Sequence, residues 1–361
     1  MALGLITLSL CCFLEACMRF SIDHGGWQRL ANPGAYYDPT CQDEYWQMLH
    51  HTPGWKDSVR VHSSHEFDAD LGWTVDGREK NKWGGWKSPS YPLRFDGKPI
   101  GVFGDSFVFS TTKDGARLPD YLAKEITEAR ILNYGVAGYG FDQIVLTFEK
   151  HAESLQGQQA LIGVLTTDLD RSVLSVRSGP KPYFKFNDTG ELSVQSAHIQ
   201  ENRAYFETHP VQPLSYLATY LRINIPRHWA VWVKKEPWNC KVDQKKKINA
   251  ALFQRLKKSC ETWDIDCSLI VFHAPERLHL RNDWRNQLIQ DQAKALEFPL
   301  IDSAESLNTQ SNPSLLYGPD RHPNASGNRI IAEQIAQALS TAQKPEKQQE
   351  DKRHKEQTGP E

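Results

Sequence analysis

Three side chains in two separate segments of the sequence could together activate a hydroxyl group. Ser106 lies in VFGDSFVFS (102–110), and Asp320 and His322 lie two residues apart in GPDRHPN (318–324). A serine hydroxyl is a weak nucleophile until a base removes its proton, and an imidazole is the better base when a carboxylate orients it. These residue types therefore predict a nucleophile, a general base and an orienting acid, if the fold brings the two segments together.

The elements expected around these segments form an alternating pattern. Short apolar runs typical of buried strands occur at 98–104, 129–136, 160–167, 267–274 and 298–304. Helical stretches are expected at about 118–128, 142–155, 244–262 and 282–296. The alternation predicts right-handed βαβ units and an α/β fold: a three-layer, mostly parallel, doubly wound (flavodoxin-like) sheet. Such sheets hold ligands at the carboxyl ends of their strands, where Ser106 is expected and to which the loop 318–324 can return.

The same motifs resemble those of the SGNH (GDSL) hydrolase superfamily, over about residues 95–342. Gly104-Asp105-Ser106 is similar to the family's first block, and Asp320 with His322-Pro323-Asn324 is similar to its last. The resemblance implies that Ser106 is the nucleophile, His322 the general base and Asp320 the acid that orients it.

Two further blocks concern the oxyanion hole that the resemblance implies. LNYGVAGYGFDQ (132–143) aligns Gly138 with the glycine whose N–H group, together with that of Ser106, would hold the oxyanion. GVLTTDLDR (163–171) departs from the family pattern, because Thr167 stands where the family has an asparagine. A threonine hydroxyl is shorter than an asparagine amide and is not committed to donating a hydrogen bond.

Two charged residues after the third expected strand are candidates for substrate contacts. Asp168 occupies the aspartate position of the same block, and Arg171 follows three residues later. A guanidinium group can bind an anionic group of a substrate or form an ion pair with a neighbouring acid, and the sequence leaves both readings open.

Three functions are compatible with these residues. The first is a serine esterase that hydrolyses a small acyl ester, with an O-acetylated glycan as one candidate substrate, through an acyl-enzyme. The second is an O-acyltransferase that passes the acyl group to an envelope polysaccharide, and the third is a catalytically silent, glycan-binding or scaffolding member of the fold. None of them requires a metal or an organic cofactor, and the formal net charge of −2 gives no electrostatic case for nucleic acid binding. The sequence does not address the oligomeric state.

The N-terminus and the cysteines bear on location. Residues 3–14 form an apolar run, followed by Glu15 and Arg19, which predicts an export signal or an N-terminal membrane anchor; a buried segment or a misassigned start of the sequence is the alternative. The expected location is therefore outside the cytoplasm, either periplasmic or membrane-anchored. Cys41, Cys240, Cys260 and Cys267 would allow two disulfides in three alternative pairings, of which 41–240 with 260–267 is one; four reduced thiols are the alternative.

Composition and pattern divide the chain into four parts. These are an apolar signal or anchor segment (1–18), a Trp-rich, irregular extension (19–94), a hydrolase-like domain (95–342) and a charged tail expected to be disordered (343–361). Alternation around Asn187–Gly190 predicts a β-hairpin within an insertion at about 180–215. The cationic stretch Lys245–Lys247 is interpreted as the solvated surface of a helix.

Overall fold

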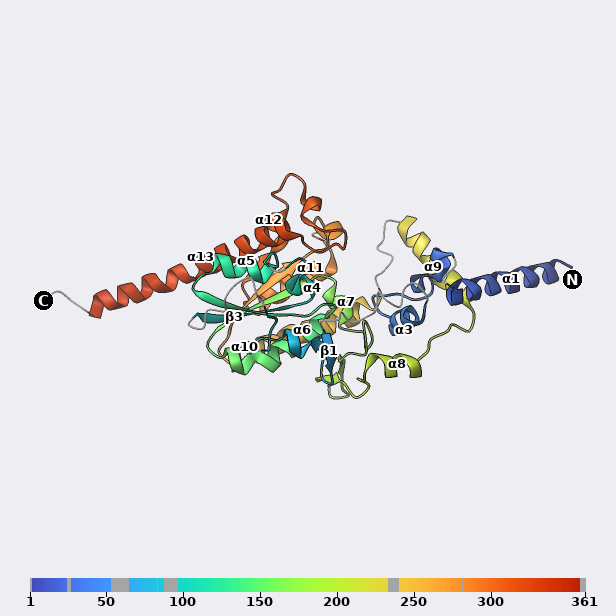
Figure 1. Cartoon of the computed structure of the whole chain (residues 1–361), viewed down its shortest axis with the longest axis horizontal. Coiled ribbons are helices and arrows are strands. Elements are labelled where there is room, and N and C mark those ends of the chain that lie inside the picture. The colour runs from blue at the N-terminus through green and yellow to red at the C-terminus, as the bar shows by residue number, and fades with distance from the viewer. Residues whose placement is uncertain are drawn as a thin grey trace. The chain divides into compact units, whose positions relative to one another are not determined.

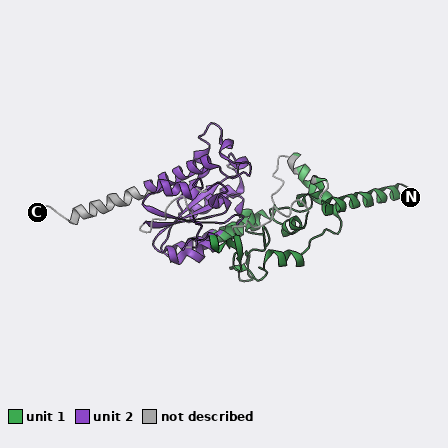
Figure 2. Cartoon of the chain, viewed as in Figure 1, with its two compact units in different colours: residues 1–78, 140–143, 169–252 green, residues 79–139, 144–168, 253–361 purple. Residues whose placement is uncertain are grey.

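The computed structural model describes residues 2–24, 27–52, 65–82, 84–87, 97–113, 115–232, 240–280 and 282–357, with the side chains of 28, 230, 231 and 342–357 excepted. The described chain forms two compact units, coloured separately in Figure 2. Unit 1 comprises residues 1–78, 140–143 and 169–252, and unit 2 comprises residues 79–139, 144–168 and 253–361. The N-terminal extension and a long insertion between the third and fourth strands of the main sheet therefore form one unit. This division differs from the linear boundaries expected from composition, in which the insertion belongs to the hydrolase-like domain.

Unit 2 is built on a parallel sheet of five strands in the order β4-β3-β5-β8-β9 (Figure 1). The strands are β3 (Lys98–Gly104), β4 (Ala129–Gly135), β5 (Gln159–Leu165), β8 (Asp266–Phe272) and β9 (Leu300–Asp302). The helices are α4 (Ser106–Phe109), α5 (Leu118–Glu125), α6 (Phe141–Ala152, which begins in unit 1), α11 (Trp284–Ala295), α12 (Ser303–Leu307) and α13 (Ala325–Gln357). Short 3-10 turns are η3 (Gly77–Glu79, of which only Glu79 lies in this unit), η4 (Glu153–Leu155), η5 (Pro275–Arg277) and η6 (Pro313–Leu316). The strand order confirms the predicted doubly wound, flavodoxin-like α/β sheet.

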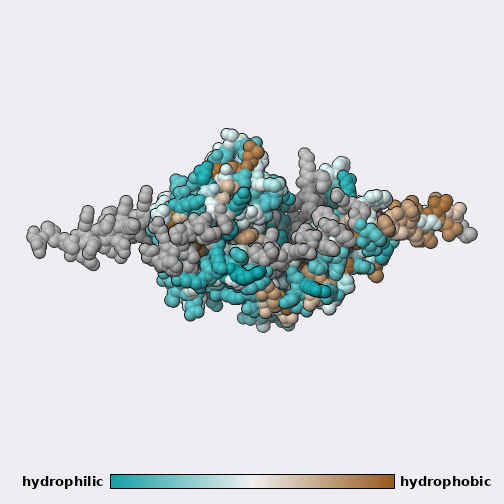
Figure 3. All heavy atoms as spheres, in the orientation of Figure 1, coloured by the Kyte–Doolittle hydropathy of each residue, from teal (hydrophilic) through white to brown (hydrophobic). Residues whose placement is uncertain are grey.

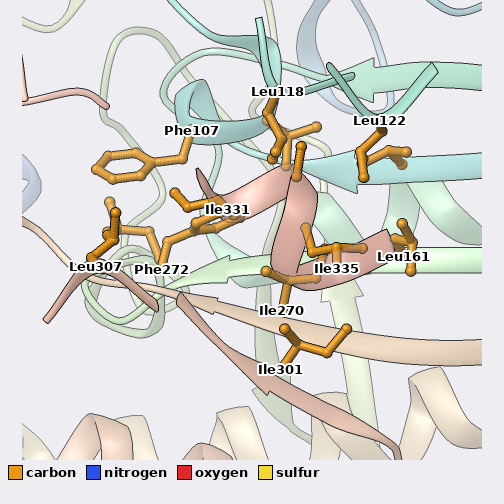
Figure 4. Packing of buried hydrophobic residues seen from close by; sticks show 14 of the residues in the cluster. Phe107, Leu118, Leu122, Leu161, Ile270, Phe272, Ile301, Leu307, Ile331 and Ile335 are labelled. Carbon is orange, nitrogen blue, oxygen red and sulfur yellow. The ribbon is translucent and has the colours of Figure 1, made fainter. Parts of the chain in front are cut away.

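The core of unit 2 lies on both faces of this sheet because side chains alternate along each strand. On one face, Val102 of β3 belongs to a buried apolar cluster with residues of α5 and α13, and Figure 4 shows how part of this cluster interdigitates. On the other face, the Phe103 ring lies 5.4 Å from the ring of Phe148 in α6. Burial on two faces explains why the strand sequences are continuous apolar runs rather than alternating ones.

Unit 1 consists of short elements and three longer helices. Its helices are α1 (Ala2–His24), α2 (Gln28–Ala31), η1 (Pro33–Ala35), α3 (Asp43–His51), α7 (Asp168–Arg171, whose first residue lies in unit 2), α8 (Asn202–Thr208), α9 (Tyr216–Trp232) and the first half of α10 (Val242–Thr262). Its strands form two antiparallel pairs, β1 (His65–Asp68) with β2 (Gly72–Val75), and β6 (Tyr183–Phe186) with β7 (Leu192–Gln195). The second pair is the hairpin predicted around Asn187–Gly190.

Disulfides occur within each unit. Cys41 is bonded to Cys240 in unit 1, and Cys260 is bonded to Cys267 in unit 2. This is one of the three pairings that the sequence allows. The first bond joins residues 199 positions apart, so it ties the N-terminal extension to the insertion.

Two lysines of unit 1 are fully buried in ion pairs. The Lys245 ammonium lies 2.7 Å from a carboxylate oxygen of Asp170, and the Lys181 ammonium pairs with the carboxylate of Asp142. The interpretation of Lys245–Lys247 as solvated surface is therefore wrong for Lys245. This residue lies on the face of α10 that packs inward, where Asp170 compensates its charge.

Two terminal segments complete the description. Among the described residues, α1 is the one helix long and apolar enough to cross a membrane, and its apolar tip is the brown end of the chain in Figure 3. At the other end, α13 continues through residues 343–357, for which composition predicts disorder. Lys, Glu and Gln dominate this segment and have high helix propensity, so the polar tail can extend a helix without a core to pack on. Residues 358–361 of the predicted tail lie outside the described residues.

Candidate active site

Ser106 is the first residue of the short helix α4, directly after strand β3. The side chain of Asp105 accepts a hydrogen bond of 2.8 Å from the Phe107 N–H group and so caps the helix. The other Asp105 oxygen lies 3.3 Å from the Ser106 hydroxyl. Asp105 is buried, and these contacts fix the turn that presents Ser106 at the carboxyl edge of the sheet.

Close packing of α4 onto β4 depends on a glycine. A Cβ atom added at Gly135 would lie 2.3 Å from the Phe109 backbone nitrogen, which no side chain could accommodate without moving the helix. The Trp86 indole donates a 2.6 Å hydrogen bond to the Gly135 carbonyl, and its ring centroid lies 4.6 Å from that of Phe109. The short helix α4, which begins at Ser106, therefore packs onto the sheet at Gly135 and against the buried ring of Trp86.

His322 comes from the loop between η6 and α13 and reaches Ser106 directly. Its Nε2 atom lies 2.8 Å from the Ser106 Oγ atom, closer than the competing carboxylate of Asp105. The loop is tight: the Gly318 N–H group donates to the His322 carbonyl at 2.8 Å. The imidazole also lies against the Phe107 ring, with centroids 5.2 Å apart. With Nε2 free of a proton, this arrangement places a base where it can take the serine proton.

Asp320 lies on the opposite side of the imidazole. One carboxylate oxygen is 3.2 Å from His322 Nδ1 and also accepts a 2.7 Å hydrogen bond from the Thr111 hydroxyl. Partial burial raises the pKa of the Asp320 carboxyl. The hydrogen bonds from the Thr111 hydroxyl and the His322 N–H group, together with the charge of His322, lower the pKa by more than burial raises it. The pKa of Asp320 therefore lies below its ordinary value. The side chain is 47% exposed, so water weakens its interaction with the imidazole.

The three residues predicted for the oxyanion hole all lie at this edge of the sheet. Ser106 is the first residue of α4, so no residue earlier in that helix can accept its N–H group. Gly138 has φ +85°, a conformation that favours glycine, in the loop after β4 whose Val136 N–H donates to the Gly104 carbonyl at 3.0 Å. Thr167 follows β5 and is partly exposed. The structure thus gathers them at neighbouring strand ends, and their roles as donors stay predictions.

The two predicted substrate contacts have different environments. Asp168 is fully buried, and its carboxylate accepts a 3.0 Å hydrogen bond from the Leu165 N–H group. It therefore stabilises the turn between β5 and α7, and its role as a substrate contact stays a prediction. Arg171 belongs to unit 1, and its role in binding an anionic group stays a prediction.

Two residues that the sequence analysis did not single out support the site. Thr111 donates to Asp320, as described above. The buried Asn328 side chain, on the second turn of α13, donates to the Ser110 hydroxyl and to the Ala116 carbonyl, each at 3.0 Å. Asn328 thus joins the helix that follows His322 to the segment that follows Ser106. Neither residue belongs to a motif, and only the tertiary structure shows its partners.

The described residues contain one group of side chains that could hold a metal ion. The one group of potential ligands close enough to share an ion is Asp38 with Cys41 and Cys240. The two cysteines are joined in a disulfide, so they offer no thiolate.

Comparisons with known proteins concern the fold. No family model matches the sequence, and no curated protein matches it. Solved structures are similar, among them a lipolytic protein of the G-D-S-L family from Veillonella parvula, at 13% identity and a TM-score of 0.37, covering 67% of this chain and 98% of that one. Another is an acetylxylan esterase from Geobacillus stearothermophilus, at 12% identity and a TM-score of 0.37, covering 69% and 96%. A third is an alpha/beta hydrolase enzyme from the metagenome of Lake Arreo, at 13% identity and a TM-score of 0.38, covering 69% and 98%.

These identities and TM-scores assign neither a family nor an activity to this chain. What the chain can do chemically follows from its own side chains.

Proposed function

We propose that this protein is a serine esterase that hydrolyses an acyl ester through an acyl-enzyme intermediate. The observation that carries the proposal is the line of contacts from Ser106 through His322 to Asp320, at 2.8 Å and 3.2 Å. A hydroxyl, an imidazole and a carboxylate in this order form the arrangement that activates serine for acyl transfer. All three belong to unit 2, so the arrangement does not depend on unit 1.

The reaction proceeds in two half-steps. His322 takes the proton of Ser106 as the serine oxygen attacks the ester carbonyl, and the resulting tetrahedral intermediate expels the alcohol, which receives that proton from His322. Water then gives a proton to His322 and attacks the acyl-enzyme. The acid is released as Ser106 regains its proton. In each half-step His322 carries a proton, and therefore a positive charge, for a time. The Asp320 carboxylate stabilises this imidazolium.

The developing oxyanion needs hydrogen-bond donors. We assign this role to the N–H groups of Ser106 and Gly138, with the Thr167 hydroxyl as a third donor. Loss of one such donor typically costs about 3–4 kcal/mol of transition-state stabilisation. Two of the three assigned donors are backbone N–H groups, which do not depend on the identity of a side chain. A substitution at Thr167 would therefore leave two donors in place.

The acyl group and the alcohol are proposed from chemistry alone. A small acyl group, such as acetyl on a glycan hydroxyl, is the substrate class put forward here. Transfer of the acyl group to a second glycan hydroxyl instead of water would use the same intermediate. A series of p-nitrophenyl esters from acetate to octanoate measures the acyl preference, and an added glycan acceptor measures transfer.

The deciding experiment is labelling with a fluorophosphonate probe, which bonds covalently to an activated serine oxygen. Wild-type protein should be labelled at Ser106, and Ser106→Ala should neither be labelled nor hydrolyse p-nitrophenyl acetate above background. Ser154→Ala is the control, because it removes an exposed hydroxyl that bonds to the His151 carbonyl and takes no part in the contacts from Ser106 to Asp320. A wild-type protein that folds but is not labelled would establish a silent member of the fold.

We also propose that the protein acts outside the cytoplasm. Two disulfides support this location, because such bonds persist in oxidising compartments. The apolar helix α1 is compatible with a signal sequence or an anchor. Mass spectrometry of non-reduced and reduced protein from the cell envelope, periplasm and detergent-extracted membranes together, tests it, since cytoplasmic protein would carry free thiols at all four cysteines.

A further inference from the structure

Helix α1 changes character along its length. All side chains from residue 2 to residue 14 are exposed, with Leu3 at 78% and Phe13 at 64%, and none of them is charged. The Thr7 hydroxyl in this half donates a 2.9 Å hydrogen bond to the Leu3 carbonyl, so its polar group is satisfied within the helix. An exposed apolar surface of this size is costly in water and is satisfied in lipid.

The second half of the helix begins at Glu15 and is bound to the rest of unit 1. The Glu15 carboxylate accepts hydrogen bonds from the Tyr216 and Leu217 N–H groups at 3.0 and 2.8 Å, and from the Ser215 hydroxyl at 2.9 Å. It therefore caps the N-terminus of α9, where unpaired N–H groups and the helix dipole favour a negative charge. The capped helix lies 200 residues further along the chain.

Arg19 strengthens the same junction. Its guanidinium lies 2.8 Å from Glu15, donates to the Leu214 carbonyl at 3.0 Å and stacks over the Tyr216 ring. Three and seven residues after Glu15, on the same side of the helix, Met18 and Ile22 are 6% and 7% exposed. They belong to an apolar cluster with Ala35, Tyr36, Tyr37, Met48 and Tyr216.

We propose that α1 is retained in the mature protein and serves two partners: residues 2–14 insert into a lipid bilayer, and residues 15–24 form part of the core of unit 1. A cleaved signal peptide has no contacts to lose when it is removed. Here, cleavage after the apolar run would take away the cap of α9 and two core side chains. The boundary between the halves lies at Glu15, where lipid contact ends and polar contact begins.

The first test asks what holds the protein to a membrane. The full chain, with a C-terminal tag, is produced in an exporting bacterium, and the membrane fraction is analysed by intact mass and by extraction with alkaline carbonate and with detergent. We expect a mass that includes residues 2–24 and extraction by detergent only. A mature protein that begins beyond residue 24, or one that carbonate releases, would overturn the proposal.

The second test separates the two halves with engineered protease sites in the full chain. A protease site inserted after residue 14 and cut in detergent, where the protease can reach it, should give protein that stays soluble when the detergent is removed, with an unchanged thermal midpoint. A cut between residues 25 and 26, followed by removal of the helix, should lower the midpoint. Equal midpoints after both cuts would show that residues 15–24 are no part of the core, and failure of the first cut to give soluble protein would exclude its apolar half as the anchor.

Two single variants provide a matched comparison where cleavage is incomplete. Leu8→Arg should weaken membrane retention and leave the midpoint unchanged. Glu15→Ala should leave retention unchanged and lower the midpoint by about 2–4 °C, the size expected for one lost helix cap in a unit of this size. The reverse pattern would contradict the division at Glu15. Fluorophosphonate labelling of Ser106 is followed in every sample, so a silent active site would be recognised separately from a wrong membrane assignment.

Discussion

The interaction between Asp320 and His322 gives the sharpest test of the catalytic assignment. In Asp320→Asn the amide is nearly isosteric with the carboxylate but carries no charge. It can also donate a hydrogen bond to His322 Nδ1, which would favour the tautomer with its proton on Nε2. That tautomer cannot accept the proton of Ser106.

The size of the effect can be worked from the distance and the exposure. Opposite unit charges 3.2 Å apart attract each other by about 1.3 kcal/mol in water and by about 5 kcal/mol at the effective dielectric of a protein surface. Because the Asp320 side chain is 47% exposed, a value between these limits applies, about 2–3 kcal/mol. The imidazolium forms only during the reaction, so kcat/KM for p-nitrophenyl acetate should fall by about 30–150-fold.

The control removes a different carboxylate from the same neighbourhood. Glu276 is about half exposed and pairs with Arg321, which lies between the two catalytic loop residues. Glu276→Gln should change kcat/KM by no more than about threefold, because no contact links it to the imidazole. The reasoning is refuted if Asp320→Asn retains the wild-type rate, or if both variants lose activity equally.

Three other substitutions follow from the structure. Thr111→Val removes a hydrogen bond that lowers the pKa of Asp320, so the carboxyl should titrate at higher pH when its signal is followed by NMR, and kcat/KM should fall by about 2–10-fold near neutral pH. An unmoved titration of Asp320 would exclude this role. Asn328→Ala should lower kcat by about tenfold or less with KM nearly unchanged, because the lost bonds position the serine segment rather than the substrate. Lys181→Met leaves the buried carboxylate of Asp142 without its partner and should reduce the free energy of unfolding by roughly 3–5 kcal/mol in urea denaturation. The double variant with Asp142→Leu should recover most of that loss.

The sequence predicts the main sheet well because each strand is a local, continuous apolar run. Burial on both faces requires such runs, and the helices between them have their own periodicity, so strand order follows from connection rules. Ser106 and His322 could be predicted because each lies in a short contiguous motif, the first directly after strand β3 and the second in the loop before α13. Asp320 came with His322, two residues away in the same loop.

Contacts between distant segments could not be predicted. Lys245 looks like any surface lysine in the sequence, and its partner Asp170 lies 75 residues earlier. The joining of the N-terminal extension to the insertion depends on pairs such as Glu15 with Ser215 and Cys41 with Cys240. No local periodicity encodes such pairs, so the predicted domain boundaries followed the linear order of the chain instead.

The division of the chain into two units also separates two kinds of requirement. The proposed catalytic residues Ser106, His322 and Asp320 all lie in unit 2. Their geometry depends on the loop before α13 and on α4, which packs onto β4 because Gly135 has no side chain. The half of α1 that the structure ties to protein lies wholly in unit 1, held by Glu15 and the cluster around Tyr216. If residues 2–14 of α1 are the proposed anchor, substitutions there should change the location of the protein and leave the reactivity of Ser106 unchanged. Damage at Asp320 should change the rate and leave the location as it is.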